Sequence, residues 1–199
     1  MVAILELARQ KGARKVVFAS SSSLYNGVST PHREDAAIPV KDYYTEARLA
    51  MERMAELYYQ LYGLDYAGLR FFSVYGPHEE AKGSYANMVT QFLWGMKMGR
   101  RPVIYGDGSQ TRDFTFVKDV VEALMLVSEK GTGIFNVGTG KAFSFTYVVE
   151  LVNSRLGTDL KPIYQENPIK NYVMHTLADT GKMESLGFRP RYLLEEGVA

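Results

Sequence analysis

The sequence predicts an α/β protein, in which helices alternate with short strands of a parallel sheet. Segments with a helical spacing of apolar residues alternate along the whole chain with short apolar runs rich in β-branched residues. In addition, 46% of the residues are hydrophobic and only 23% are charged. A chain of this composition has enough apolar surface to bury a sizeable core and is expected to be globular.

The first third of the chain contains two predicted helix–strand pairs. Residues 2–11 have helical periodicity up to Gly12, and the run 15–20 is apolar and rich in β-branched residues. A longer helix is predicted over 44–62, followed by a strand over 66–72. Because a helix separates the two strands, we expect them to be parallel neighbours in one sheet.

The same alternation continues to the C-terminal part. The predicted elements are, in chain order, a helix over 84–98, a strand over 102–105, a helix over 118–130, a strand over 134–137 and a helix over 144–156. The glycine cluster Gly131–Gly140 begins after a helix and contains a predicted strand. A phosphate-binding glycine turn joins a strand to a helix instead, so this cluster predicts two ordinary turns.

Charge and cysteine content exclude several classes of protein. The chain carries 23 Lys and Arg against 22 Asp and Glu, and this net charge of +1 argues against a polycationic nucleic-acid partner. The absence of cysteine excludes disulfides, thiolate metal sites and thiol nucleophiles, and no metal site is predicted. The first residues form an amphipathic helix, and no run of eighteen apolar residues occurs. We therefore expect a cytoplasmic protein with no membrane partner.

Hydroxyl side chains lie at the end of the first predicted strand. The run Ser20–Ser23 follows the apolar segment 15–19 directly. Open α/β sheets bind ligands at the carboxyl ends of their strands, where hydroxyls can orient a polar substrate. Serines at this position also satisfy the amides of turns, and the run alone favours that structural role.

Tyr44 and Arg48 lie at the start of the predicted helix 44–62. A spacing of four residues places the phenol and the guanidinium on one helix face. A nearby cation favours the phenolate form of tyrosine, which can accept a proton as a general base. The same pair, taken alone, is common on helix surfaces without any function.

Six motifs in order carry a family resemblance. They are the serine run to Tyr25, the segment from Tyr44 to Glu52, Leu69–Pro77, Tyr105–Phe114, Phe135–Gly140 and Leu177–Thr180. Together they resemble the extended short-chain dehydrogenase/reductases, and in particular sugar-nucleotide epimerases similar to UDP-glucose 4-epimerase.

The resemblance implies a Rossmann-like, doubly wound parallel sheet and a smaller α/β region. Residues 1–76 would be the C-terminal part of an NAD-binding domain, and 77–199 would mainly bind the nucleotide sugar, with segments that return to the sheet. The family's first strands and its glycine-rich pyrophosphate turn are not found in these residues, so we expect an incomplete sheet. An exposed strand edge invites association, and the family commonly forms homodimers through the helix at 44–62.

The resemblance also assigns catalytic and cofactor residues. Ser21 corresponds to the catalytic hydroxyl, Tyr44 to the catalytic base and Arg48 to the family's lysine. The implied cofactor is NAD, with Ala19, Ser20, Tyr44, Arg48 and Phe71 as its binding residues. Arginine keeps the charge of lysine, but its planar fork is larger than an ammonium group.

The implied substrate is a UDP-sugar. Its binding residues would be Ser22, Ser23 and Ser73 at the hexose, Asn87 and Arg112 at the diphosphate, Val103 and Tyr105 at the uracil, and Lys170 in place of a missing arginine. Ser73 stands where the family usually has asparagine, and Ile169–Tyr172 replaces an Arg-Pro-Gly-Asp motif.

The type of reaction follows from the residues after Ser21. Related 4,6-dehydratases carry an Asp-Glu pair there, whereas this chain has Ser22 and Ser23. Without a carboxylate to move protons at the other carbons of the hexose ring, the predicted reaction is oxidation and re-reduction at C4 of the hexose. Two alternatives stay open: a catalytically silent sugar-nucleotide-binding or assembly module, favoured by Arg48, and a nucleotide-sugar dehydratase or reductase of the same family.

Overall fold

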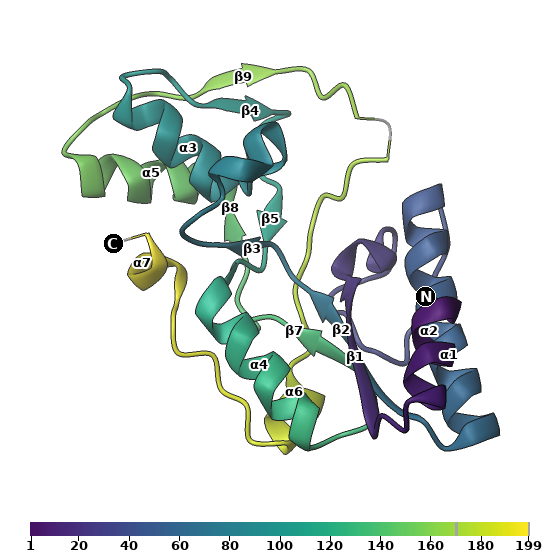
Figure 1. Cartoon of the computed structure of the whole chain (residues 1–199). Helices are drawn as coiled ribbons and strands as arrows, with labels where there is room; N and C mark the ends of the chain where they lie inside the picture. The colour runs from purple at the N-terminus through teal and green to yellow at the C-terminus, as the bar shows by residue number, and fades with distance from the viewer. Residues whose placement is uncertain (170, 199) are drawn as a thin grey trace.

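A three-stranded parallel sheet lies at the centre of the molecule (Figure 1). The computed structural model describes residues 1–169 and 171–198. The strands β1 (Lys15–Ser21), β2 (Asp65–Phe71) and β7 (Gly133–Val137) lie in the order β1-β2-β7. The predicted α/β class and the parallel pairing of the first two strands are confirmed.

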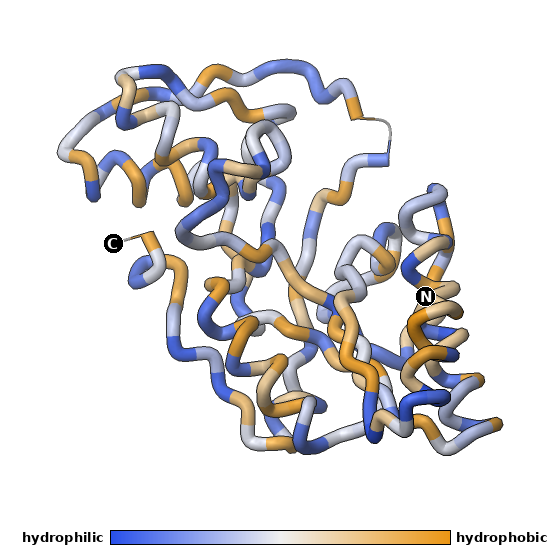
Figure 2. Tube along the Cα trace, in the orientation of Figure 1, coloured by the Kyte–Doolittle hydropathy of each residue, from blue (hydrophilic) through white to orange (hydrophobic). Residues whose placement is uncertain are grey.

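Helices cover both faces of this sheet. One face carries α1 (Val2–Gln10) and α2 (Tyr43–Tyr62), and the other carries α4 (Val117–Glu129) and the short α6 (Gly181–Ser185). Phe18 and Tyr66 pack toward α1 and α2, whereas Leu69 and Val137 pack toward α4. Since both faces are buried, the strands are largely apolar along their length (Figure 2). The doubly wound arrangement is confirmed.

Local sequence signals explain the bounds of α2. Asp42 accepts a hydrogen bond from the amide of Thr45, and the hydroxyl of Thr45 accepts one from the amide of Asp42. This reciprocal capping box satisfies two amides that the helix start leaves without partners. At the other end, Gly63 adopts φ 68°, the left-handed conformation that ends many helices.

The short helix η1 (Ser22–Tyr25) follows β1 and lies next to α2. The remaining elements form a smaller α/β region above the sheet in Figure 1. They are β3 (Val74–Tyr75), η2 (Glu80–Tyr85), α3 (Met88–Lys97), β4 (Val103–Tyr105), β5 (Thr111–Arg112), β6 (Thr115–Phe116), β8 (Phe143–Ser144), α5 (Phe145–Leu156), β9 (Ile163–Gln165) and α7 (Leu194–Gly197). Short pairs β3–β6, β4–β9 and β5–β8 join distant segments. An aromatic core of Phe92, Phe114 and Phe145 holds α3 against α5.

Two predictions from periodicity have different outcomes. The helix over 84–98 is wrong at its start, because the side chain of Asn87 accepts a hydrogen bond from the amide of Val89 and so caps a helix that begins at Met88. The strand predicted inside Gly131–Gly140 is observed as β7, and bends follow it at Gly138 and Gly140. The strand predicted over 102–105 is observed as β4 (Val103–Tyr105), whereas the other strands of two or three residues were not predicted, because such lengths show no period.

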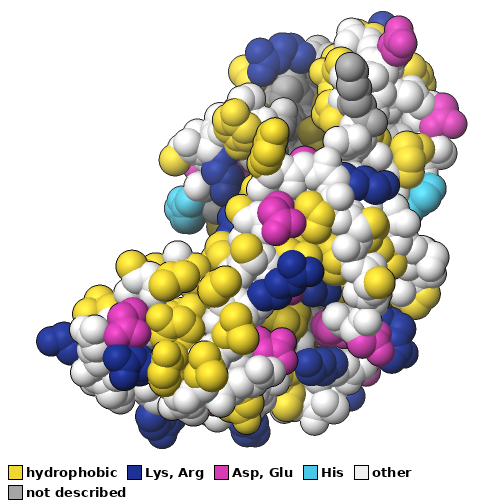
Figure 3. All heavy atoms as spheres, turned by 90° about the vertical axis from the view of Figure 1, so that its right-hand side faces the viewer, with side chains coloured by type: hydrophobic (Ala, Val, Ile, Leu, Met, Phe, Trp, Pro, Cys, Tyr) yellow, Lys and Arg dark blue, Asp and Glu magenta, His cyan; other side chains and the backbone are white. Residues whose placement is uncertain are grey.

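Apolar side chains remain exposed on α1 and α2. Ile4 and Leu7 on α1 are 60% and 56% exposed, and Leu61 on α2 is 68% exposed. Figure 3 shows hydrophobic side chains gathered on this side of the molecule. None of the helices in residues 1–169 and 171–198 is long and apolar enough to cross a membrane.

Candidate functional site

The carboxyl ends of the three central strands meet at one edge of the sheet. Ser21, Phe71 and Val137 end their strands in neighbouring register positions. The Ser21 Oγ atom accepts a hydrogen bond from the amide of Ser23 at 3.1 Å and so starts the short helix η1. A hydroxyl that accepts one hydrogen bond still has its own proton to donate. Ser21 therefore combines the structural role of a cap with a remaining donor.

Arg48 connects Tyr44 to the end of β1. Its Cζ atom lies 5.0 Å from the centre of the Tyr44 ring, and its Nη1 atom donates a hydrogen bond to the carbonyl of Ala19 at 3.0 Å. The guanidinium thus contacts the face of the phenol ring, a cation–π arrangement. Tyr44 itself is 50% exposed, so its ring is accessible from outside. The structure thus brings Tyr44 and Arg48 next to Ala19, which lies two residues before Ser21 in β1.

Two residues assigned to the cofactor have side chains that are engaged elsewhere. The hydroxyl of Ser20 donates a hydrogen bond to Glu52 Oε1 at 2.5 Å, below helix α2. The ring of Phe71 packs into the apolar cluster beneath α4. The Ser20 side chain is thus buried and hydrogen-bonded within the chain, whereas Phe71 is only partly buried.

A cavity of about 280 Å³ collects four of the residues assigned to the substrate. Ser22 and Ser23 from η1, Ser73 after β2 and Arg112 from β5 all line it, together with Ile169. Ser73 has φ 29°, a conformation that is uncommon outside glycine. Strained backbone of this kind is concentrated at functional sites, so its place beside Arg112 supports the assignment of this cavity.

The Arg112 guanidinium already has partners within the chain. Nη1 and Nη2 donate hydrogen bonds to the carbonyls of Met174 and Val173 at 3.1 Å and 2.5 Å. The rings of Phe145 and Tyr172 lie 5.4 Å and 5.2 Å from its Cζ atom. Burial lowers the pKa of Arg112 below its ordinary value. Sequence reasoning missed Tyr172 as a partner of Arg112, because the two are far apart along the chain.

Asn87, Val103 and Tyr105 do not line this cavity. The Asn87 amide group is committed to the start of α3, where Oδ1 caps Val89 and Nδ2 donates to the carbonyl of Val74 at 3.1 Å. Val103 and Tyr105 lie in β4, which pairs with β9. Lys170 lies outside the described residues.

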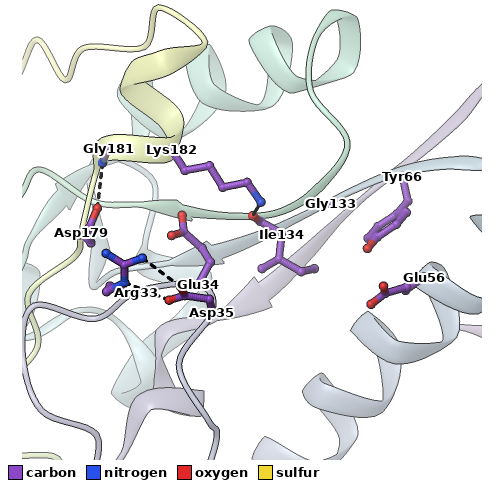
Figure 4. A pocket seen from close by; sticks show the side chains of 10 residues that line it. All are labelled: Arg33, Glu34, Asp35, Glu56, Tyr66, Gly133, Ile134, Asp179, Gly181 and Lys182. Carbon is purple, nitrogen blue, oxygen red and sulfur yellow. Dashed lines mark hydrogen bonds and ion pairs between the residues drawn. The ribbon is translucent and has the colours of Figure 1, made fainter.

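A second, larger hollow of about 550 Å³ lies along the open edge of β7 (Figure 4). Here Glu34 accepts a hydrogen bond from the amide of Asn136 at 2.8 Å, and Lys182 donates one to the carbonyl of Ile134 at 2.6 Å. Burial lowers the pKa of the Lys182 ammonium. None of the residues assigned to catalysis, cofactor or substrate lines this hollow. Its charged side chains satisfy backbone groups at a strand edge and so protect the edge from association.

Doubly wound α/β sheets bind ligands at the carboxyl ends of their strands, and it is there that this chain places its hydroxyls, the tyrosine–arginine pair and a polar cavity. The model of the NAD dependent epimerase/dehydratase family matches residues 1–138, and the chain belongs to this family.

Several known proteins are similar over nearly the whole chain. A putative UDP-glucose 4-epimerase of Methanocaldococcus jannaschii is 35% identical over 98% of this chain, which covers 64% of that protein. The structure of UDP-glucose 4-epimerase with UDP-glucose from Thermotoga maritima is 33% identical, and the match covers 99% of this chain and 65% of that protein, with a TM-score of 0.93. The structure of UDP-glucose 4-epimerase with NAD from Thermus thermophilus is 30% identical, and the match covers 99% of this chain and 65% of that protein, with a TM-score of 0.86. The chain thus spans slightly under two thirds of their length.

Proposed function

We propose that this chain acts in an NAD-dependent sugar-nucleotide epimerase that inverts C4 of the hexose in UDP-glucose or UDP-galactose. One observation carries the proposal: Arg48 joins the Tyr44 ring to the strand that ends in Ser21, beside a cavity lined by Ser22 and Arg112. The names of the Thermotoga and Methanocaldococcus proteins support a UDP-hexose as substrate.

In this proposal Tyr44 exchanges a proton with the C4 hydroxyl of the hexose. The Ser21 hydroxyl donates a hydrogen bond to the same oxygen and fixes its position. The guanidinium of Arg48, 5.0 Å from the ring centre, holds the Tyr44 ring beside the end of β1 through a cation–π contact. Arg112 attracts the diphosphate, because a guanidinium donates charge-assisted hydrogen bonds to phosphate oxygens.

The residues present suit the nicotinamide end of NAD. A half-exposed phenol, a guanidinium and a serine hydroxyl at a strand end can bind ribose hydroxyls and the carboxamide. When bound, NAD would accept a hydride from C4 and return it. No glycine-rich turn of the pyrophosphate-binding kind joins a strand to a helix within the described ranges 1–169 and 171–198. We therefore expect these residues to bind UDP more tightly than NAD.

Replacement of Tyr44 tests the proposed base. With NAD in excess, Tyr44→Phe should abolish epimerisation of UDP-glucose, while calorimetry should give a nearly unchanged UDP affinity, since the hydroxyl is needed only for proton transfer. The adjacent Tyr43 is 97% exposed, so Tyr43→Phe serves as the matched control. Wild-type turnover in Tyr44→Phe would refute the assignment.

A second candidate function is UDP-sugar binding without turnover. The placement of Arg48 favours it, because the guanidinium lies on the Tyr44 ring face and on the Ala19 carbonyl, where a compact ammonium would leave more room for a ribose. The variant Arg48→Lys separates the two functions. An epimerase limited by its arginine gains turnover in this variant, whereas a silent binding module shows turnover in neither form.

We also propose that the chain forms a homodimer through α1 and α2. Ile4, Leu7 and Leu61 leave apolar surface exposed on these helices (Figure 3). Burial of such surface in a second copy stabilises association by about 25 cal/mol per Å². Sedimentation should show a dimer at micromolar concentration, and Leu61→Glu should shift it toward monomer.

A further inference from the structure

A row of polar side chains crosses the central sheet one residue before its carboxyl end. Ser20 on β1, Arg70 on β2 and Asn136 on β7 occupy neighbouring register positions and are all buried. The residues two positions earlier on β1 and four earlier on β2, Phe18 and Tyr66, are part of the apolar core under α1 and α2. Polar groups buried on this face cost free energy unless each finds a partner.

Arg70 is the centre of the network that satisfies this row. Its Nε and Nη2 atoms donate to the two oxygens of Glu52 at 3.0 Å and 2.6 Å, and its Nη1 atom donates to the Tyr25 hydroxyl at 2.8 Å. The same Glu52 carboxylate accepts the bond from Ser20, and Tyr25 donates to Asn136 Oδ1 at 2.7 Å. We call these five residues the polar belt: Ser20, Tyr25, Glu52, Arg70 and Asn136.

Two partners of Arg70 belong to elements that carry residues of the proposed site, and a third, longer bond of 3.4 Å goes to the carbonyl of Glu34. Glu52 lies on α2, two turns after Tyr44 and one turn after Arg48. A spacing of four and eight residues places the three on one helix face. Tyr25 ends η1, the element that begins with Ser22. Through Glu52 and Tyr25, Arg70 therefore links both α2 and η1 to β2, the middle strand of the sheet.

The physics of a buried ion pair favours a role in position over one in stability. Arg70 and Glu52 are 3% and 5% exposed. Desolvation offsets most of the attraction of such a pair, so an apolar pair of similar volume is often equally stable. A bidentate guanidinium–carboxylate contact, however, accepts only one relative geometry. Burial also raises the pKa of Tyr25 to about 12, which keeps its hydroxyl protonated as a donor to Asn136.

We propose that Arg70 is a positioning residue with two separate arms: through Glu52 it positions Tyr44 and Arg48, and through Tyr25 it positions Ser22 and Ser23. The inference rests on the proposed function for the roles of these residues. It predicts that loss of one arm affects proton transfer, whereas loss of the other affects substrate binding.

Two variants cut one arm each. Glu52→Gln keeps the shape of the side chain but removes the charge, and it should lower kcat for UDP-glucose about tenfold or more with KM nearly unchanged, because a small misplacement of a catalytic group is costly. Tyr25→Phe removes only a hydroxyl, and it should raise KM and the UDP dissociation constant about tenfold with kcat nearly unchanged.

Two further variants separate position from stability. Glu52→Leu with Arg70→Met removes both charges of the pair, so it should be less destabilised than Glu52→Gln, which leaves Arg70 buried without a counter-charge, and it should still lose kcat. Val127 is fully buried in α4, on the opposite face of the sheet from the polar belt. Val127→Ala should therefore lower stability and, well below its melting temperature, leave kcat and KM unchanged.

Amide hydrogen exchange without ligand tests the same arms independently of turnover. Glu52→Gln should speed exchange about tenfold in the first two turns of α2, and Tyr25→Phe should do so in η1, each in that segment alone. The inference would be overturned if exchange in Glu52→Gln and Tyr25→Phe increased throughout the protein, as in Val127→Ala. It would also be overturned if kcat and KM changed together in both variants. Segment-specific exchange in a protein that shows no turnover even as wild type would refute the epimerase function and leave the positioning role standing.

Discussion

Replacement of Arg112 by alanine gives a quantitative test of the substrate cavity. The guanidinium lines the cavity, lies 5.4 Å and 5.2 Å from the centres of the Phe145 and Tyr172 rings, and donates to the carbonyls of Thr111, Met174 and Val173 through Nη1 and Nη2. A hydrogen bond between charged groups contributes about 1.5–3 kcal/mol. At about 1.4 kcal/mol per tenfold change, Arg112→Ala should weaken UDP binding by roughly tenfold to a hundredfold.

Calorimetry with UDP measures this change, and Arg101 provides a matched control. Arg101 also donates to two backbone carbonyls, those of Lys161 and Pro162 at 2.8 Å and 3.0 Å, but it does not line the cavity. Arg101→Ala should lose similar structural hydrogen bonds and keep its UDP affinity. An equal loss of affinity in both variants would show that Arg112 acts only by holding the chain together, and unchanged affinity in Arg112→Ala would refute its contact with the diphosphate.

Three further predictions concern stability. Burial lowers the pKa of His32, so the unfolded chain binds a proton below about pH 6.5 that the folded chain does not, and stability falls as the pH decreases. Urea unfolding at pH 7.5 and 5.5 should show a larger loss of unfolding free energy in the wild type than in His32→Phe, and equal losses would contradict this cause. A Cβ atom on Gly138 would lie 2.5 Å from Ala178 Cβ and 2.8 Å from Asp113 Oδ2, so Gly138→Ala should destabilise by about 1–3 kcal/mol. Gly95 lies within helix α3 with no atom within 4 Å of an added Cβ, so Gly95→Ala should instead raise the unfolding free energy by about 0.5–1 kcal/mol, and a loss of stability there would contradict the reasoning.

Much of the central fold follows from local chemistry. The period of apolar residues predicts α2 within one residue of its observed bounds, because its start is capped by Asp42 and Thr45 and its end by Gly63. The hydroxyls after β1 and the tyrosine–arginine spacing on α2 also predict that polar side chains gather at the carboxyl ends of the strands. These features depend on neighbours along the chain, so they can be read from the sequence alone.

Other features exist only because the tertiary structure brings distant residues together. The stacking of Tyr172 on Arg112 joins positions sixty residues apart in the sequence, and the bond from Tyr25 to Asn136 joins positions 111 apart. The strand registers that place Ser20, Arg70 and Asn136 in one row have no local signal, because register depends on which strands pair. Sequence periodicity identifies which face of an element is buried, whereas the partner of a buried charge depends on how the elements pack.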